Sequence, residues 1–265
     1  VGSEGRHMQH QAYITIEGKR LEYAATGIDT EAPTLVFLHE GLGCLELWRD
    51  FPKQLAAATG YGYLAYSRAG YGRSDPMEQP LQPNYLHQQA AVLQEVLEHF
   101  QIAKPVLVGH SDGASIALIY AGSGYTPAPT ALIVEAPHIF VEGITLAGIE
   151  ETVARYENSR LHERLRRYHG DKTEATFRAW SSAWQQPEFR GWSIEALLPG
   201  ITSPTQVIQG SDDQYGTLAQ IETIAEAVAG PASKVVLEGC KHIPHQERSD
   251  EVLQAMAEFI GSHCG

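Results

Sequence analysis

The stretch "VLVGHSDGAS" (residues 106–115) joins an apolar run to a helix-forming segment across one sharp corner. A strand is expected to end near Gly109 and a helix to begin within a few residues. Gly109 and Gly113 lie two residues on either side of Ser111, where a side chain would clash in so tight a turn. In this strand–turn–helix context the G-x-S-x-G pattern predicts a serine nucleophile, and the alternative interpretation is that Ser111 only caps the helix.

A serine hydroxyl is a weak nucleophile unless a base accepts its proton and a third group orients that base. The segment "QGSDDQYG" follows an expected strand and offers Asp212 and Asp213 as the acid. The segment "EGCKHIPHQE" follows the last expected strand and offers His242 and His245. His242 is the predicted base because it comes directly after the strand, whereas His245 is expected to stabilise the first turn of the following helix.

Apolar runs alternate with helical patterns along most of the chain, which predicts an α/β fold with a doubly wound, mostly parallel sheet. In such sheets the reactive groups gather in loops beyond the carboxyl ends of the strands. The expected strands lie at 11–18 and 20–26 (a hairpin), 34–40, 61–67, 105–110, 130–137, 204–213 and 234–242. The expected helices lie at 46–58, 84–100, 114–122, 217–229 and 246–261.

The stretch 137–199 interrupts this alternation, because it has helical patterning and no good strand. We therefore expect an α/β core over 8–136 and 200–265 and an inserted helical cap over 137–199. Residues 1–7 are interpreted as a cloning remnant that precedes a native start at Met8.

Composition excludes several classes of function. The formal net charge of −13 argues against nucleic acid and anionic membranes as partners. Three widely spaced cysteines argue against a disulfide framework and favour a cytoplasmic protein. No Cys/His cluster has zinc-ligand spacing, and no apolar run approaches the ~18 residues that span a bilayer.

The cap region departs from this acidic balance. Residues 151–190 hold eight Lys/Arg and six Asp/Glu, a net +2 against −15 for the rest. This charge is either an ordinary solvated face or a means of attracting a carboxylate-bearing substrate. Phe177, Trp180 and Trp184 share one helical face, which either packs the cap onto the core or lines an apolar pocket.

An oxyanion intermediate requires hydrogen-bond donors. The backbone amide of Asp112 is one candidate. The second is expected in "HEGLG" (residues 39–43), where glycines let the backbone approach a substrate closely. His39 is expected to hold this loop by hydrogen bonding.

Together, "LHEGLG", "SRAGYGRS", "VGHSDGAS", "QGSDDQYG" and "GCKHIPHQE" resemble the α/β-hydrolase fold superfamily in order and spacing, over nearly the whole chain from about residue 11. The resemblance implies an eight-stranded sheet with a cap after the sixth strand. It implies Ser111 as nucleophile, His242 as base and Asp213 as acid, with the amides of Gly41 and Asp112 as the oxyanion hole.

The sequence also departs from the family pattern. His39-Glu40 replaces the usual His-Gly, and Asp112 stands where an apolar residue is common. Two carboxylates beside an oxyanion hole oppose the developing charge unless they point away or pair with cations such as Arg68 or the cap arginines. Glu135 is an alternative position for the acid that some relatives use.

The resulting hypothesis is a serine hydrolase of the carboxylesterase type, acting without cofactor or metal on a small-molecule ester or lactone. Alternatives are an enol-lactonase or C–C bond hydrolase of aromatic-degradation products, a perhydrolase, and a non-catalytic ligand receptor. A dehalogenase or epoxide hydrolase is disfavoured because those chemistries use a carboxylate at the position of Ser111. The candidate substrate pocket comprises Glu40, His110, Phe177, Trp180 and Trp184.

Overall fold

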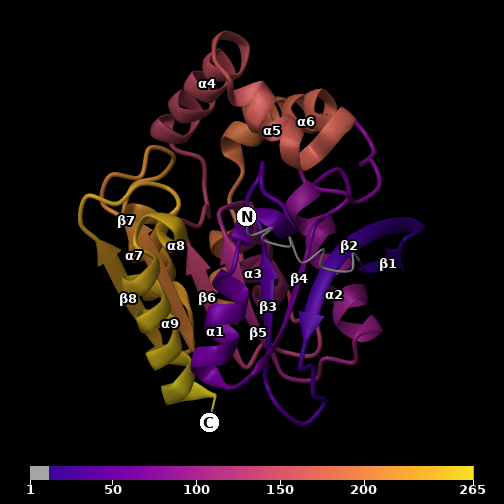
Figure 1. Cartoon of the computed structure of the whole chain (residues 1–265). Helices are drawn as coiled ribbons and strands as arrows, with labels where there is room; N and C mark the ends of the chain where they lie inside the picture. Colours follow the sequence, from indigo (N-terminus) through magenta and orange to yellow (C-terminus); the bar gives the residue numbers. More distant parts are fainter. Residues whose placement is uncertain (1–11, 265) are drawn as a thin grey trace, which may run out of the picture.

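The computed structural model describes residues 12–264, so the interpretation of residues 1–7 lies outside the described residues. An eight-stranded sheet with the order β1-β2-β4-β3-β5-β6-β7-β8 runs through the described chain (Figure 1). Its strands are β1 (Ala12–Ile16), β2 (Lys19–Thr26), β3 (Thr34–Leu38), β4 (Gly62–Tyr66), β5 (Pro105–His110), β6 (Ala131–Glu135), β7 (Thr205–Gly210) and β8 (Ala232–Leu237).

The strands β3 to β8 run parallel, and β2 runs antiparallel to both of its neighbours. The central strands β3, β5, β6 and β7 are buried along their whole length. Continuous apolar runs of this kind are typical of a parallel sheet covered on both faces, as the sequence predicted.

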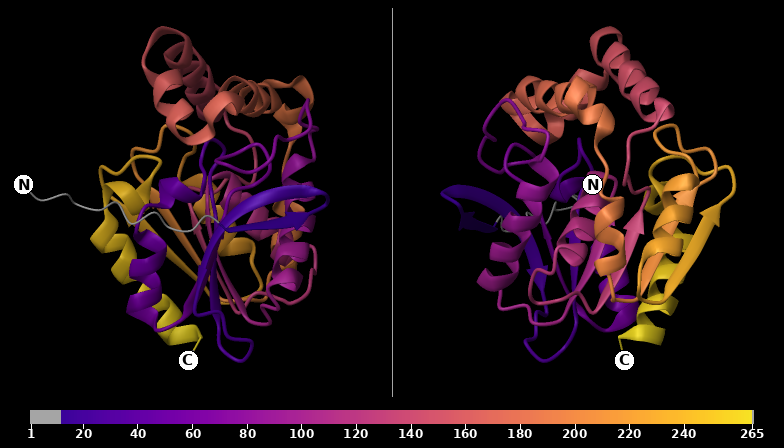
Figure 2. Two further views of the ribbon diagram at one scale, coloured as in Figure 1. Left: turned by 45° about the vertical axis from the view of Figure 1, so that its right-hand side comes forward. Right: turned by 180° about the vertical axis from the view of Figure 1, so that it is seen from behind.

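Helices cover both faces of the sheet (Figures 1 and 2). On one face α1 (Phe51–Thr59) packs beside α9 (Ser249–His263), and their apolar side chains share a core with β3 and β5. On the other face lie α2 (Tyr85–His99), α3 (Asp112–Gly122) and α7 (Ala219–Ala227). Burial on both faces fixes the sheet, and hence the loops that follow its strands.

Two expected helices are divided in the structure. The expected helix 46–58 consists of a 3₁₀ turn, η1 (Leu45–Trp48), followed by α1, because Arg49 adopts a positive φ of 54° between them. The expected helix 246–261 consists of α8 (Pro244–Glu247) and α9, which starts five residues later than Pro244. Periodicity alone does not register such breaks.

Between β6 and β7 the chain forms the helices α4 (Gly143–Asn158), α5 (Leu161–His169) and α6 (Thr173–Gln185). Three 3₁₀ segments accompany them: η2 (Gly170–Lys172), η3 (Pro187–Gly191) and η4 (Glu195–Gly200). The helices α4, α5 and α6 lie over one end of the sheet (Figure 2); we call residues 143–185 the cap helices. The division of the chain into core and cap domains stays a prediction.

No helix between residues 12 and 264 has the length and apolar character needed to cross a bilayer.

Candidate active site

Ser111 lies at the sharp corner between β5 and α3, and its backbone has a positive φ of 52°. Glycines make this corner possible. A Cβ at Gly109 would lie 2.4 Å from the carbonyl oxygen of Gly113, and a Cβ at Gly113 would lie 1.9 Å from that of Leu38. The elbow is therefore packed against both its own helix and β3, and its strained backbone holds Ser111 between them.

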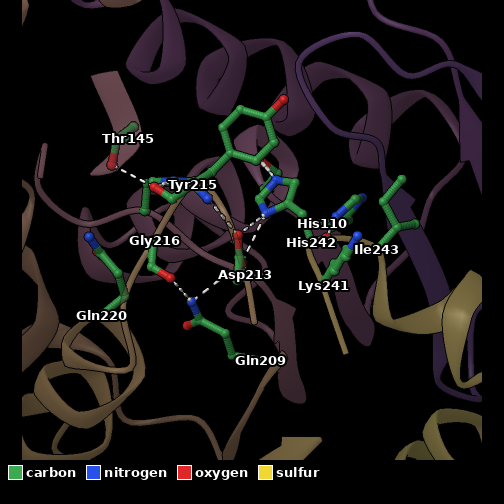
Figure 3. Close-up of polar contacts among 12 residues, drawn as sticks. His110, Thr145, Gln209, Asp213, Tyr215, Gly216, Gln220, Lys241, His242 and Ile243 are labelled. Carbon is green, nitrogen blue, oxygen red and sulfur yellow. Dashed lines mark hydrogen bonds and ion pairs between the residues drawn. The ribbon is translucent and has the colours of Figure 1, made fainter. Parts of the chain in front are cut away.

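The structure brings Ser111, Asp213 and His242 together, although they are far apart in the sequence. Nε2 of His242 lies 3.0 Å from Oγ of Ser111. Nδ1 of His242 lies 2.9 Å from each carboxylate oxygen of Asp213 (Figure 3). With the Nδ1 proton donated to Asp213, Nε2 is free to accept the proton of the serine hydroxyl.

The carboxylate of Asp213 is held by more than His242. The backbone N–H of Tyr215 donates to Oδ1 at 2.8 Å, and Nε2 of Gln209 donates to Oδ2 at 3.4 Å (Figure 3). Burial acts to raise the pKa of Asp213, but the charge and hydrogen bond of His242 outweigh it, so the pKa lies below its usual value. Asp213 is therefore ionised at neutral pH.

The alternative acid, Glu135, has a different partner. Its Oε2 lies 2.8 Å from Nδ1 of His245, and both side chains are buried. The His245 ring packs against Trp48 and Phe51. His245 lies in α8, the helical turn in which the sequence placed it, and there it forms a buried pair that ties α8 to the end of β6.

Two backbone N–H groups beside Ser111 are unused. Neither the amide of Gly41 nor that of Asp112 donates a hydrogen bond to any part of the described chain. Both residues line the same cavity as Ser111. Free amides next to a nucleophile are suited to bind a developing oxyanion, which is the function that the sequence analysis expected of them.

Glu40 is neutralised by the residue that precedes the nucleophile. Its Oε2 lies 3.5 Å from Nδ1 of His110, while Nε2 of His110 donates to the carbonyl of His242 at 2.7 Å. Burial acts to lower the pKa of His110, but the Glu40 carboxylate raises it to about 9. A protonated His110 thus connects the loop after β3, the elbow and the loop after β8.

His39 holds the same loop from the other side. Its Nδ1 donates to the carbonyl of Glu40 at 2.7 Å, and its Nε2 accepts from the backbone N–H of Arg68 at 3.1 Å. Burial and the nearby Arg68 charge keep the pKa of His39 well below its usual value, which fits this neutral tautomer.

Asp112 lines the cavity, and its buried carboxylate pairs with two other buried side chains. Oδ2 of Asp112 lies 3.8 Å from the Arg68 guanidinium and accepts a hydrogen bond from the Tyr85 hydroxyl at 2.8 Å. The same hydroxyl accepts the indole N–H of Trp184 at 2.9 Å. Asp112 therefore connects the first turn of α3 to α2 and, through Tyr85, to the cap helix α6.

A cavity of about 330 Å³ opens beside Ser111 under the cap helices. Of the predicted pocket residues, Glu40, His110, Trp180 and Trp184 line it. Phe177 does not: it is fully buried inside the cap and stacks on Tyr156 with ring centroids 3.7 Å apart. Of the three aromatic residues on one face of α6, Trp180 and Trp184 line the cavity, whereas Phe177 packs α6 against α4.

Sequence reasoning missed two residues of the site, His138 and Tyr215, which both line the cavity. Nε2 of His138 donates to the carbonyl of Tyr215 at 3.1 Å, and burial lowers the pKa of His138 to about 4, leaving it neutral. The Tyr215 ring packs on His242 with centroids 4.6 Å apart (Figure 3). Their positions in the sequence could have indicated them. His138 follows the strand-end residue Glu135 by three positions, and Tyr215 follows Asp213 by two.

The loops that carry Ser111, Asp213 and His242 follow β5, β7 and β8, so they meet at the carboxyl edge of one mostly parallel sheet. A serine elbow with an acid and a histidine later in the chain is how enzymes of the α/β-hydrolase fold are built. The chain belongs to the alpha/beta hydrolase family, whose family model matches residues 35–255.

Solved structures with this fold cover almost the whole chain. The enol-lactonase from Burkholderia xenovorans LB400 superimposes with a TM-score of 0.74 at 20% identity, over 94% of this chain and 100% of that one. An esterase from Exiguobacterium antarcticum gives 0.76 at 19%, over 94% and 98%. Epoxide hydrolase A of Mycobacterium tuberculosis (strain ATCC 25618 / H37Rv) is 35% identical over 60 residues, which are 23% of this chain and 19% of that protein.

Proposed function

We propose that this chain is a cofactor-independent serine hydrolase that cleaves carboxylic esters through an acyl-enzyme. The observation that carries the proposal is the chain of contacts from Ser111 through His242 to Asp213, with distances of 3.0 and 2.9 Å. Such contacts are those of a nucleophile, its base and the acid that orients the base.

In the proposed reaction His242 Nε2 removes the proton of Ser111 as Oγ attacks the ester carbonyl. The amides of Gly41 and Asp112 bind the oxyanion of the tetrahedral intermediate. His242 then protonates the leaving alcohol, and afterwards activates the water that hydrolyses the acyl-enzyme. Asp213 fixes the imidazole tautomer and stabilises its charged form throughout.

Two other functions are less well supported by the site. Epoxide hydrolysis on this fold uses a carboxylate nucleophile, and the elbow position here is Ser111. A binding protein without catalytic activity has no need of a hydrogen-bonded serine, histidine and carboxylate. The same three groups also suit the hydrolysis of a lactone or of an activated C–C bond, because both reactions begin with attack on a carbonyl.

The test is the hydrolysis of p-nitrophenyl acetate by wild type and Ser111→Ala. We expect Ser111→Ala to lower kcat by at least about 10³-fold with an unchanged fold by circular dichroism, because the nucleophile is lost. A fluorophosphonate probe should label the wild type and not Ser111→Ala. Ser123→Ala, an exposed serine at the other end of α3, is the matched control.

The two candidate acids are separated by amide variants. Asp213→Asn should lower kcat by about 10³- to 10⁴-fold, because the amide favours the wrong tautomer of His242. Glu135→Gln should have a much smaller effect, since its partner is His245. An unchanged rate in Ser111→Ala, or an equal loss in the two amide variants, would contradict the assignment.

A further inference from the structure

Four arginines line the cavity beside Ser111, and all four are exposed: Arg49, Arg155, Arg164 and Arg167. Arg155 lies on α4, Arg164 and Arg167 lie on α5, and Arg49 follows η1. Within the described chain none of these guanidinium groups forms an ion pair or a side-chain hydrogen bond. Four positive charges at the exposed side of the cavity are thus left without a protein partner.

This lack of partners is not general in the cap helices. Arg166 pairs with Asp171 at 3.2 Å, and Arg178 pairs with Glu174 at 2.9 Å and with Glu157 at 3.2 Å. Acidic residues are thus available on the cap helices, and two arginines outside the cavity use them. The arginines that line the cavity remain available to a ligand.

The carboxylates that line the cavity do not neutralise these arginines. They are Glu40 and Asp112, and each already has a buried cation beside it, His110 and Arg68 respectively. The cavity therefore has a charge-balanced inner end and a positive outer side, on a chain whose formal net charge is −13. An anionic ligand is repelled by the net negative charge of the molecule and attracted by the arginines of this cavity.

Much of the cavity wall is apolar. Ser111 and His242 are buried at the inner end, and the exposed arginines lie at the outer side. The same cavity is also lined by apolar side chains, including Ile149, Leu161, Leu165, Trp180 and Trp184. A matching ligand has a carbonyl at one end, an apolar middle and a negative charge at the other end.

We propose that the substrate is an ester carrying an anionic group, a carboxylate or a phosphate, remote from the scissile bond. This inference rests on the ester hydrolysis proposed above and names its substrate class. The guanidinium groups of Arg155, Arg164 and Arg167 bind the anionic group, for which their planar pairs of N–H donors are suited. The ester carbonyl then lies at Ser111 while the apolar segment contacts the cavity wall.

The first test compares esters that differ only in a terminal charge. Mono-p-nitrophenyl glutarate and p-nitrophenyl pentanoate place the charge, or a methyl group, on the acyl side. 3-Carboxy-4-nitrophenyl butyrate and p-nitrophenyl butyrate place it on the leaving group. We expect kcat/KM to favour the anionic ester about tenfold in at least one pair, and this preference to shrink in 0.5 M NaCl. Equal or lower kcat/KM for both anionic esters would overturn the inference.

The second test removes the charges one at a time. Arg155→Gln, Arg164→Gln and Arg167→Gln should each lower the anionic-to-neutral ratio of kcat/KM by about two- to fivefold, the size expected for exposed ion pairs. Arg160→Gln is the matched control, because Arg160 is an exposed cap arginine outside the cavity and its loss changes the net charge equally. If Arg160→Gln lowers the ratio as much as the other three variants, the effect is one of overall charge and the inference fails.

A binding measurement separates this inference from the proposed function. In Ser111→Ala, quenching of tryptophan fluorescence reports ligand binding, because Trp180 and Trp184 line the cavity. Monoethyl glutarate and ethyl 4-phosphonooxybutyrate should bind more tightly than ethyl pentanoate, and the tighter of the two identifies carboxylate or phosphate. Selective binding without wild-type turnover contradicts the proposed function alone. Turnover without selectivity contradicts the substrate class alone.

Discussion

Glu40 and Asp112 are the two residues at which this chain departs most from the family pattern, and both are explained by their partners. Glu40 pairs with His110, the residue before the nucleophile, and Asp112 pairs with Arg68 and Tyr85. The two carboxylates therefore carry compensating cations beside the oxyanion hole. Their charge is used to fix the loops around Ser111 instead of opposing the intermediate.

Gly41 is the residue at which a single methyl group should disturb the oxyanion hole. A Cβ at Gly41 would lie 2.2 Å from Nε1 and 2.5 Å from Cδ1 of Trp180, so either the indole or the loop must move. Loss of one oxyanion donor costs about 10²- to 10³-fold in kcat. We expect Gly41→Ala to lower kcat for p-nitrophenyl acetate by at least about tenfold.

The control for Gly41→Ala is Gly143→Ala, because no other part of the described chain lies within 4 Å of a Cβ at that position on α4. Gly143→Ala should retain wild-type kcat. A second variant, Trp180→Ala combined with Gly41→Ala, removes the clash and should recover part of the lost activity. Wild-type kcat in Gly41→Ala alone would show that the amide of Gly41 does not act on the intermediate.

Residue-level prediction succeeded where the motif fixes the backbone. The sequence predicted that side chains at Gly109 and Gly113 would clash in the turn around Ser111. The structure agrees, since a Cβ at either glycine meets backbone atoms. It failed where the partner is set only by tertiary packing. The position of His242 directly after the last strand indicated the base, but no feature of the sequence pairs His245 with Glu135, a contact that only the fold brings about.

At the scale of elements, hydrogen bonds join the cap helices to the active-site loops at two places. The carbonyl of Tyr215, in the loop that holds Asp213, accepts from Thr145 of α4 at 2.6 Å (Figure 3). On the other side Trp184 of α6 reaches Asp112 through the hydroxyl of Tyr85. The cap helices are thus joined to the acid loop and to the nucleophile helix.

The hydroxyl of Tyr85 joins Trp184 to Asp112, and it can be removed without changing the ring. Tyr85→Phe leaves the indole N–H of Trp184 without its acceptor and Asp112 with one donor fewer. Leaving buried polar groups unpaired costs about 1–3 kcal/mol. We expect the free energy of unfolding, measured in urea, to fall by about 2 kcal/mol.

Tyr66→Phe is the matched control for Tyr85→Phe. Tyr66 is equally buried, but its hydroxyl has no hydrogen-bond partner among residues 12–264. Its removal should leave the free energy of unfolding unchanged or slightly higher, because an unpaired polar group is lost. If both variants lose the same stability, the connection between Asp112, Tyr85 and Trp184 contributes nothing specific.

At the scale of the whole molecule, the sequence predicted the parallel sheet and its strands because buried strands read as continuous apolar runs. The positions of the cap helices relative to the core were beyond prediction, since the surfaces that meet there include polar residues such as Thr145, Thr176 and His169. Thr176 donates to the carbonyl of Gly70 at 2.6 Å, and the backbone N–H of Gly72 donates to His169 at 2.9 Å. Such contacts follow no periodic pattern.

Buried histidines should give the whole molecule a stability maximum near pH 6.5. Burial lowers the pKa values of His39, His138 and His169 below the ordinary 6.5, so the unfolded chain binds more protons in acid. Stability from these groups is complete above pH 6.5 and is lost as the pH falls toward about 4, the pKa of His138. The measured free energy of unfolding should therefore decrease as the pH is lowered from 6.5 toward 4.

On the alkaline side of neutrality, we expect the loss of stability to come from His110. Burial lowers the pKa of His110, but the Glu40 carboxylate outweighs burial and raises it to about 9. For a raised pKa the stabilisation is complete below the unfolded value of about 6.5 and is lost as the pH rises through 9. Between pH 6.5 and 8.5 we expect the free energy of unfolding in urea to fall by about 2 kcal/mol. Glu40→Gln removes the charge that holds the proton on His110, so this slope should flatten. An identical slope in Glu40→Gln would mean that His110 is not the group that titrates.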